Sequence, residues 1–107
     1  MHLTMVKKRL ADGSECRKCV EASAHLKSRE LWDRVDEVVW AVEDDPESAG
    51  MRLAAAHSLW QAPFFIVRDG ADERLYTSVL QLIRQELGQA VTVQERVRDL
   101  DPDDIGI

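Results

Sequence analysis

The chain has 107 residues, of which 45% are hydrophobic, and its 20 acidic and 14 basic side chains give a formal net charge of −6. This length and apolar content fit one compact domain, and the negative charge disfavours nucleic acid as a partner because it would repel the phosphate backbone. No apolar run approaches the roughly 18 residues of a membrane span, and no apolar stretch follows the basic residues 7–9, so we expect a cytoplasmic chain with no membrane partner.

The first two predicted elements are a strand and a helix. Apolar side chains occupy both odd-numbered and even-numbered positions from Leu3 to Leu10, and the turn-forming sequence Asp12-Gly13-Ser14 follows. This pattern predicts a strand and its exit loop. A helix is predicted from Cys16 to about Arg29, with Ser14 or Glu15 near its start. Its inward positions recur at helical spacing: Cys19, Ala22 and Leu26.

The middle of the chain predicts another strand and helix. Residues 38–42 form a continuous apolar run rich in β-branched side chains, which is typical of a central or parallel strand that is buried on both faces. Asp44-Asp45-Pro46 then predicts a helix from about Glu47 to Ser58, lying close to the sheet. We expect four residues on its inner side: Met51, Ala54, Ala55 and Leu59.

The last elements are a hairpin and a helix. Phe64 to Val67 predicts a third two-faced strand, and Asp69-Gly70 predicts a tight turn into a short strand at Arg74 to Thr77. Ser78 is the expected N-cap of a helix from Val79 to Leu87, and Gly88 ends it. The resulting order, β-α-β-α-β-β-α, predicts an α/β fold with a four-stranded mixed sheet, because a βαβ unit sets two strands parallel and a hairpin adds an antiparallel pair.

The sequence predicts two regions. We expect residues 1–90 to form one domain and residues 91–107 to form an acidic C-terminal tail, with Asp99, Asp101, Asp103 and Asp104. A short helix over Val91 to Leu100 is predicted within the tail, with disorder after it.

The chemistry of the chain is concentrated in its only two cysteines, Cys16 and Cys19, spaced as Cys-Arg-Lys-Cys. A structural disulfide is not expected, because so short a loop contributes only about 2 kcal/mol and cytosolic disulfides are usually catalytic or sensing. Three residues apart on a helix, the two sulfurs share one side. The helix N-terminus, Arg17 and Lys18 favour a reactive thiolate at Cys16, whereas Glu15 opposes it. The pair therefore predicts thiol–disulfide exchange.

The cysteine pair lies between the first strand and its helix, and Ala62-Pro63 opens the third strand in Ala62-Pro63-Phe64-Phe65-Ile66-Val67. In both features the chain resembles the thioredoxin superfamily, on its glutaredoxin-like side, over roughly residues 3–88. The resemblance implies a thioredoxin fold with helices on both faces of the sheet. It also implies that Cys16 is the exposed nucleophile and that Cys19 resolves the mixed disulfide. Ala62-Pro63 would be a cis bond beside the cysteines, and the backbone of Ala62 would pair with the bound substrate.

The implied function is a monomeric thiol–disulfide oxidoreductase without a cofactor, which acts on a protein disulfide or a low-molecular-weight thiol. We expect Ala62, Pro63, Arg17 and Lys18 to contact that substrate. Glutaredoxins have a lysine three residues before the first cysteine and a Gly-Gly turn before the last helix. This chain has Gly13 and residues 75–78 there, which counts against glutathione. Thioredoxins have a tryptophan before the first cysteine and Gly-Pro between the two, where this chain has Glu15, Arg17 and Lys18.

Two alternatives stay open from the sequence. One is a redox-inert interaction module of the same fold. The other is a homodimer that binds a metal ion or iron–sulfur cluster through the cysteine pair, with His25 or His57 as added ligands. We expect no metal site within a single chain, and we expect Trp60 to pack against the fold rather than to line the active site.

Overall fold

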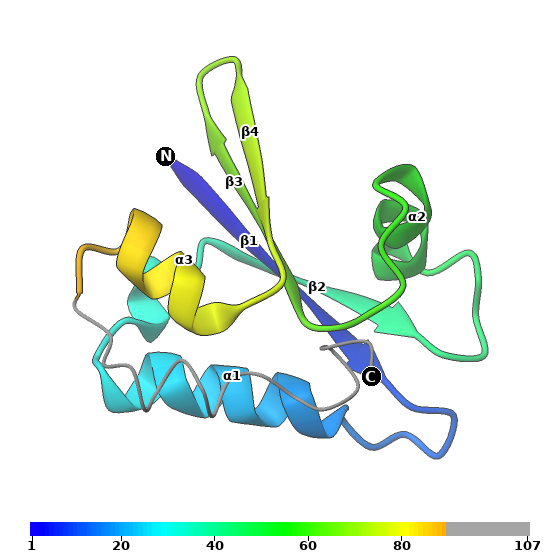
Figure 1. Ribbon diagram of the computed structural model, residues 1–107. Helices are drawn as coiled ribbons and strands as arrows, with labels where there is room; N and C mark the ends of the chain where they lie inside the picture. The colour runs from blue at the N-terminus through cyan, green and yellow to red at the C-terminus, as the bar shows by residue number, and fades with distance from the viewer. Residues whose placement is uncertain (90–107) are drawn as a thin grey trace, which may run out of the picture.

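The computed structural model describes residues 1–89, which form an α/β structure with the predicted element order (Figure 1). The strands are β1 (His2–Arg9), β2 (Glu37–Val42), β3 (Phe64–Asp69) and β4 (Asp72–Tyr76). The helices are α1 (Arg17–Ser28), α2 (Ala49–Ala56) and α3 (Val79–Glu86), together with a short 3-10 helix, η1 (Trp32–Arg34), that the sequence pattern did not predict. The predicted tail at 91–107, with its helix at 91–100, lies outside the described residues.

The four strands form one mixed sheet in the order β2-β1-β3-β4, which confirms the predicted sheet. β1 and β2 are parallel, whereas β3 is antiparallel to both β1 and β4. β1 has a neighbour on each side and is buried from Leu3 to Lys7. Residues 10–16 then connect the end of this central strand to helix α1 and include the first cysteine.

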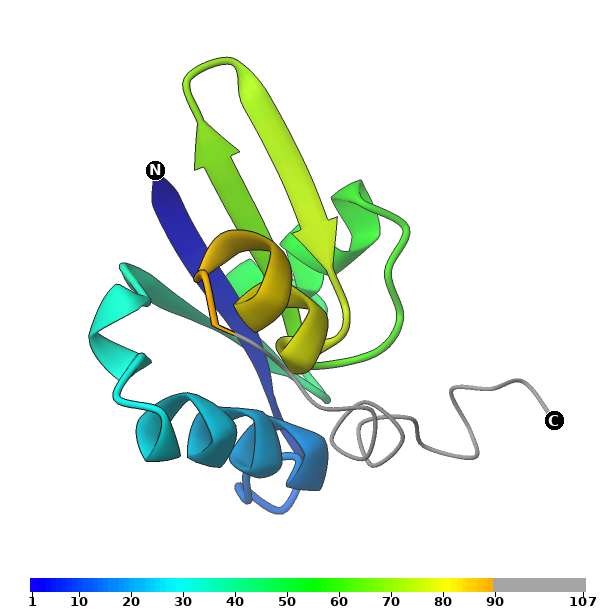
Figure 2. The same ribbon diagram turned by 60° about the vertical axis from the view of Figure 1, so that its left-hand side comes forward.

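Helices cover both faces of the sheet, as expected (Figures 1 and 2). On one face α1 and α3 pack over side chains of β1 and β3: Leu3, Met5, Phe65 and Val67. On the other face α2 packs over Val6, Phe64, Ile66 and Ala41. Successive side chains of a strand point to opposite faces, so β1 and β3 divide the core into two parts.

The position of β2 differs from the prediction. β2 is parallel to β1, but it lies at the edge of the sheet, and Ala41 alone of its six residues is buried. The prediction of burial on both faces is therefore wrong. An apolar run shows that a strand tolerates burial, but it does not show whether a second strand pairs with it, and within residues 1–89 none does.

Helix α2 contacts the sheet through a glycine. A methyl group on the Cα of Gly50 would lie 2.3 Å from the nitrogen of Ala41 and 2.5 Å from the carbonyl carbon of Trp40, so the two backbones touch. Ala54, one turn later, is buried as expected. Ala55 is exposed, and its predicted inner position is wrong, because the close approach at Gly50 turns the face of Gly50 and Ala54 toward the sheet.

Helix α3 is fixed at its N-terminus and to the neighbouring strand. The Ser78 hydroxyl accepts a hydrogen bond from the backbone N–H of Gln81 at 3.1 Å, which confirms the predicted N-cap. Arg74 of β4 donates two hydrogen bonds to Glu86, at 2.6 and 3.1 Å, and the Tyr76 hydroxyl donates a third at 2.6 Å. The Arg74 guanidinium is the main cause of a lowered pKa at Glu86. This side-chain cluster joins the hairpin to α3.

Candidate active site

The start of α1 is placed by β1. Cys16 is the N-cap of α1, and its backbone N–H donates to the carbonyl oxygen of Lys8 at 2.9 Å. Arg9 and Glu15 also pair as an isolated β-bridge. The helix therefore starts slightly later than predicted, because residues up to Glu15 remain paired with β1. The Cys16 side chain makes no capping hydrogen bond, which leaves its sulfur available for other contacts.

Cys19 lies fully buried in the first turn of α1. The backbone N–H of Lys8 donates to its sulfur at 3.2 Å. Lys8 therefore holds both cysteines: its carbonyl oxygen accepts from the backbone of Cys16, and its N–H donates to the thiol of Cys19. Both thiols are free. This arrangement joins the pair to the central strand of the sheet.

The loop before β3 reaches Cys16 from a distant part of the sequence. The sulfur of Cys16 lies 4.0 Å from the carbonyl oxygen of Ala62, which is 46 residues away. The Ala62–Pro63 peptide bond is cis, as the resemblance implies, with Pro63 buried and Ala62 half-buried. The predicted nucleophile thus lies directly beside the backbone that was predicted to pair with substrate.

The two sulfurs differ in accessibility and in acidity. Cys16 is half-buried, so its sulfur is the one that can meet an external disulfide. Burial raises the pKa of the Cys19 thiol to about 12; the Lys8 N–H opposes this shift, and the negative charges of Cys16 and Glu15 add to it. Cys19 is therefore a neutral thiol near pH 7 while Cys16 is free.

We expect iodoacetamide to modify Cys16 well before Cys19 at pH 8, because the alkylating agent reacts with an accessible thiolate and Cys19 is neither accessible nor ionised. Peptide mapping by mass spectrometry measures the two rates. In about 8 M urea both cysteines should react alike. Equal rates in the folded protein would contradict the assignment of one exposed and one buried thiol.

The two basic residues between the cysteines occupy different surroundings. Arg17 is exposed, and its guanidinium donates to Glu21 of the next turn at 3.2 Å. Lys18 is half-buried. Ala62 lies beside Cys16, whereas Arg17 pairs with Glu21 along α1. A role for these two basic residues in substrate contact stays a prediction.

Sequence reasoning missed a charged pair next to the cysteines. Lys7 is only 8% exposed, and its Nζ lies 3.0 Å from an Oε of Glu15. Its ammonium group also lies over the ring of Trp40, 4.9 Å from the ring centroid. The sequence did contain an indication of this pair. Leu3, Met5 and Lys7 are alternate residues of β1, and alternate side chains of a strand point to the same face, here the face that α1 covers.

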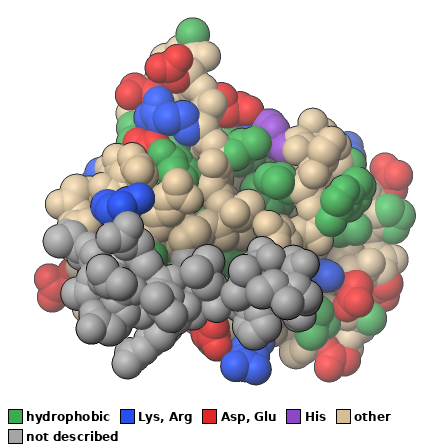
Figure 3. Space-filling model, viewed as in Figure 1, with side chains coloured by type: hydrophobic (Ala, Val, Ile, Leu, Met, Phe, Trp, Pro, Cys, Tyr) green, Lys and Arg blue, Asp and Glu red, His purple; other side chains and the backbone are tan. Residues whose placement is uncertain are grey.

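Two large apolar side chains that lie close in sequence to Cys16 and Ala62 are exposed. Val20, one turn after Cys16, is 51% exposed, and Trp60, two residues before Ala62, is 79% exposed. The expectation that Trp60 packs against the fold is wrong. Figure 3 shows further hydrophobic side chains at the surface of the molecule, between the β3–β4 hairpin and α2.

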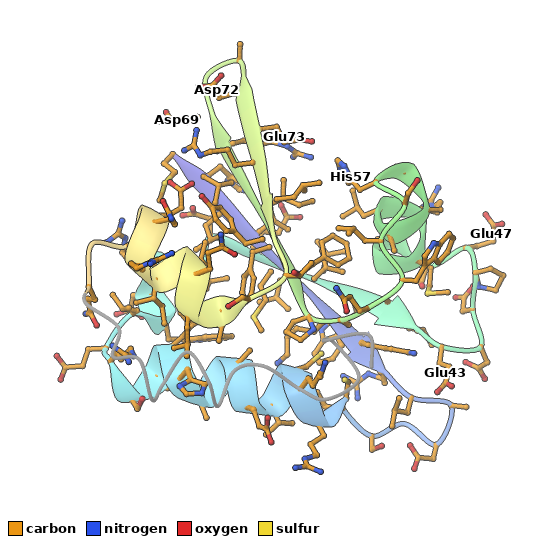
Figure 4. All side chains as sticks on the ribbon, in the orientation of Figure 1. Glu43, Glu47, His57, Asp69, Asp72 and Glu73 are labelled. Atoms are coloured by element: carbon orange, nitrogen blue, oxygen red, sulfur yellow. The ribbon has the colours of Figure 1, made fainter. Side chains whose placement is uncertain are left out.

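Other ionisable side chains do not form a metal centre in the described part of the chain. Within residues 1–89, no group of three His, Cys, Asp or Glu side chains is placed to hold a metal ion. His57 at the end of α2 instead pairs with Glu73 of β4, with a nitrogen–oxygen distance of 3.6 Å (Figure 4). Asp69 and Asp72 lie at the hairpin tip, away from His57.

In the same residues, no helix combines the length and the apolar character needed to cross a lipid bilayer. No family model, curated protein or solved structure matches the chain.

Proposed function

We propose that the chain is a thioredoxin-fold, glutaredoxin-like thiol–disulfide oxidoreductase, in which Cys16 attacks and Cys19 resolves. One observation carries the proposal: an accessible sulfur and a buried sulfur are held together on the peptide groups of Lys8, with the accessible one facing the carbonyl oxygen of Ala62. Such a pair can make two disulfide bonds in succession. We further propose that the protein acts in the cytoplasm as a monomer and needs no cofactor.

In the first step, the thiolate of Cys16 attacks one sulfur of the substrate disulfide. A mixed disulfide forms, the substrate disulfide bond breaks, and one substrate sulfur leaves as a thiolate. The N-terminus of α1 favours the attacking anion, because the first N–H groups of a helix have no intrahelical partner and the helix dipole is positive there. Cys16 occupies this position at the N-cap.

In the second step, Cys19 attacks the sulfur of Cys16. Once Cys16 is in a mixed disulfide, it carries no charge that could raise the pKa of Cys19, while the Lys8 N–H still stabilises the thiolate. The proton of Cys19 passes to the released thiolate. The Cys16–Cys19 disulfide closes, the second substrate thiolate leaves, and two electrons have moved to the substrate. An external dithiol must reduce the pair before the next cycle.

The surface near Cys16 favours a protein disulfide over glutathione as the substrate. Val20, four residues after Cys16, and Trp60, two residues before Ala62, provide exposed apolar area. An extended peptide can hydrogen bond to the backbone of Ala62 and bury apolar side chains against these two residues. Glutathione is small and polar, and it would leave this apolar area uncovered.

The test is to trap the intermediate with Cys19→Ser. This variant should accumulate a mixed disulfide on Cys16 when mixed with an excess of a small disulfide-bonded protein, because the attack still occurs and the resolving thiol is gone. Intact-mass spectrometry measures the adduct. Oxidised glutathione, in a parallel reaction, should give less adduct at equal concentration.

Cys16→Ser is the matched control and should form no adduct, because the buried Cys19 cannot reach the substrate. Absence of any adduct on Cys19→Ser would contradict the proposal and favour the redox-inert module. The metal-binding homodimer would instead show one zinc or iron centre for two chains, which elemental analysis and the molecular mass in solution would detect.

A further inference from the structure

Lys7, near the end of β1, and Glu15, just before α1, form a charged pair beside the loop that joins these two elements. The Lys7 ammonium belongs to the central strand β1 and has a side chain only 10% exposed, while the Glu15 side chain is 25% exposed. Their charged atoms are 3.0 Å apart. A lysine so deeply buried needs a partner for its charge, and Glu15 provides it.

Aromatic rings hold the Lys7 ammonium in place. It lies 4.9 Å from the ring centroid of Trp40 in β2 and 5.8 Å from that of Trp32 in η1. Two further cations contact the same rings: the Arg9 guanidinium at 4.2 Å from Trp40, and the Lys27 ammonium of α1 at 5.0 Å from Trp32. Glu15 is the acidic side chain that pairs with Lys7 in this basic cluster.

Glu15 also belongs to the surroundings of the dithiol. It directly precedes Cys16, and its backbone is fixed by the bridge to Arg9. Its negative charge acts on Cys19, where it is among the causes of the raised pKa. A carboxylate this close disfavours a second negative charge on either sulfur unless a cation compensates it.

We propose that Lys7 is a positioning residue for the exchange reaction: it binds and neutralises the Glu15 carboxylate, and so removes a negative charge that would oppose the attack of Cys16 as a thiolate. The inference rests on the proposed function, because it concerns the reactivity of the same sulfur. It assigns a role to a residue that touches neither the sulfurs nor the substrate.

The test compares Lys7→Met, Glu15→Gln and the double variant with the wild type. The rate of iodoacetamide alkylation at Cys16, in which the sulfur displaces iodide, is measured by peptide mapping at pH 6.5 and pH 9.5. At pH 6.5 we expect Lys7→Met to react about three- to tenfold more slowly, since an uncompensated charge remains nearby. Glu15→Gln should react faster, and the double variant should lie close to the wild type. At pH 9.5, which favours the thiolate in all variants alike, the rates should converge.

The opposite signs of the two single variants separate this role from a merely structural one, which would slow both. Single variants that change the rate in the same direction, or differences that persist at pH 9.5, would overturn the inference. Should Lys7→Met fail to fold, Glu15→Gln and the double variant still decide it. If Cys16 is reactive in the wild type and no variant changes its rate, the inference alone fails; if wild-type Cys16 reacts no faster than free cysteine, the proposed function itself is contradicted.

Discussion

Replacing Cys16 with serine is expected to abolish the reduction of a protein disulfide coupled to dithiothreitol, with a loss of at least about a hundredfold in rate. A serine hydroxyl is not ionised at neutral pH and cannot displace a thiolate from a disulfide, whereas a cysteine thiolate can. The buried Cys19 cannot substitute, because it is fully covered and its pKa is about 12. The rate of insulin reduction, followed by turbidity, measures the loss.

The fold should survive this substitution. The Cys16 side chain is half-buried and does not cap α1, and serine is itself a favourable N-cap residue. Thermal unfolding of Cys16→Ser should therefore resemble that of the wild type. Wild-type activity that is no higher than that of Cys16→Ser would contradict the assignment of the nucleophile.

Replacing Gly50 with alanine is expected to lower the free energy of unfolding by about 2–4 kcal/mol. The added methyl group would lie 2.3 Å from the backbone nitrogen of Ala41, and no side-chain rotation can relieve a contact with backbone. Helix propensity alone predicts the opposite sign, because alanine is favoured over glycine by about 1 kcal/mol in a helix. Urea unfolding measures which effect is larger.

Ala55→Gly is the matched control, since Ala55 is exposed on the same helix. It should lose about 1 kcal/mol from helix propensity, without any contact to the sheet. A Gly50→Ala protein as stable as the wild type would show that α2 does not rest on the backbone of β2.

Element order and the cysteine site were predictable from the sequence because both depend on local signals. The Asp69-Gly70 turn, the Ser78 cap and the spacing of Cys16 and Cys19 each involve a few neighbouring residues. The contact of Cys16 with Ala62, 46 residues away, was expected only through the resemblance to a known family. The periodicity of apolar residues alone does not predict which loops lie side by side.

The errors come from contacts between elements. The apolar run of β2 could not reveal an edge position, since pairing depends on other strands. The inner face of α2 was assigned from its alanines, but the close approach of two backbones at Gly50 decides its rotation. Trp60 was expected to pack because tryptophan is usually well buried, yet it is 79% exposed.

The most direct test of the central claim is a redox titration of the wild-type chain. The protein is equilibrated in buffers with graded ratios of reduced to oxidised glutathione and, for more reducing conditions, of reduced to oxidised dithiothreitol, quenched with an alkylating agent, and mapped by mass spectrometry. We predict one reversible two-electron transition, in which Cys16 and Cys19 of the same chain form a disulfide. A chain that stays reduced in every buffer, or that forms disulfides only between copies, would contradict the account.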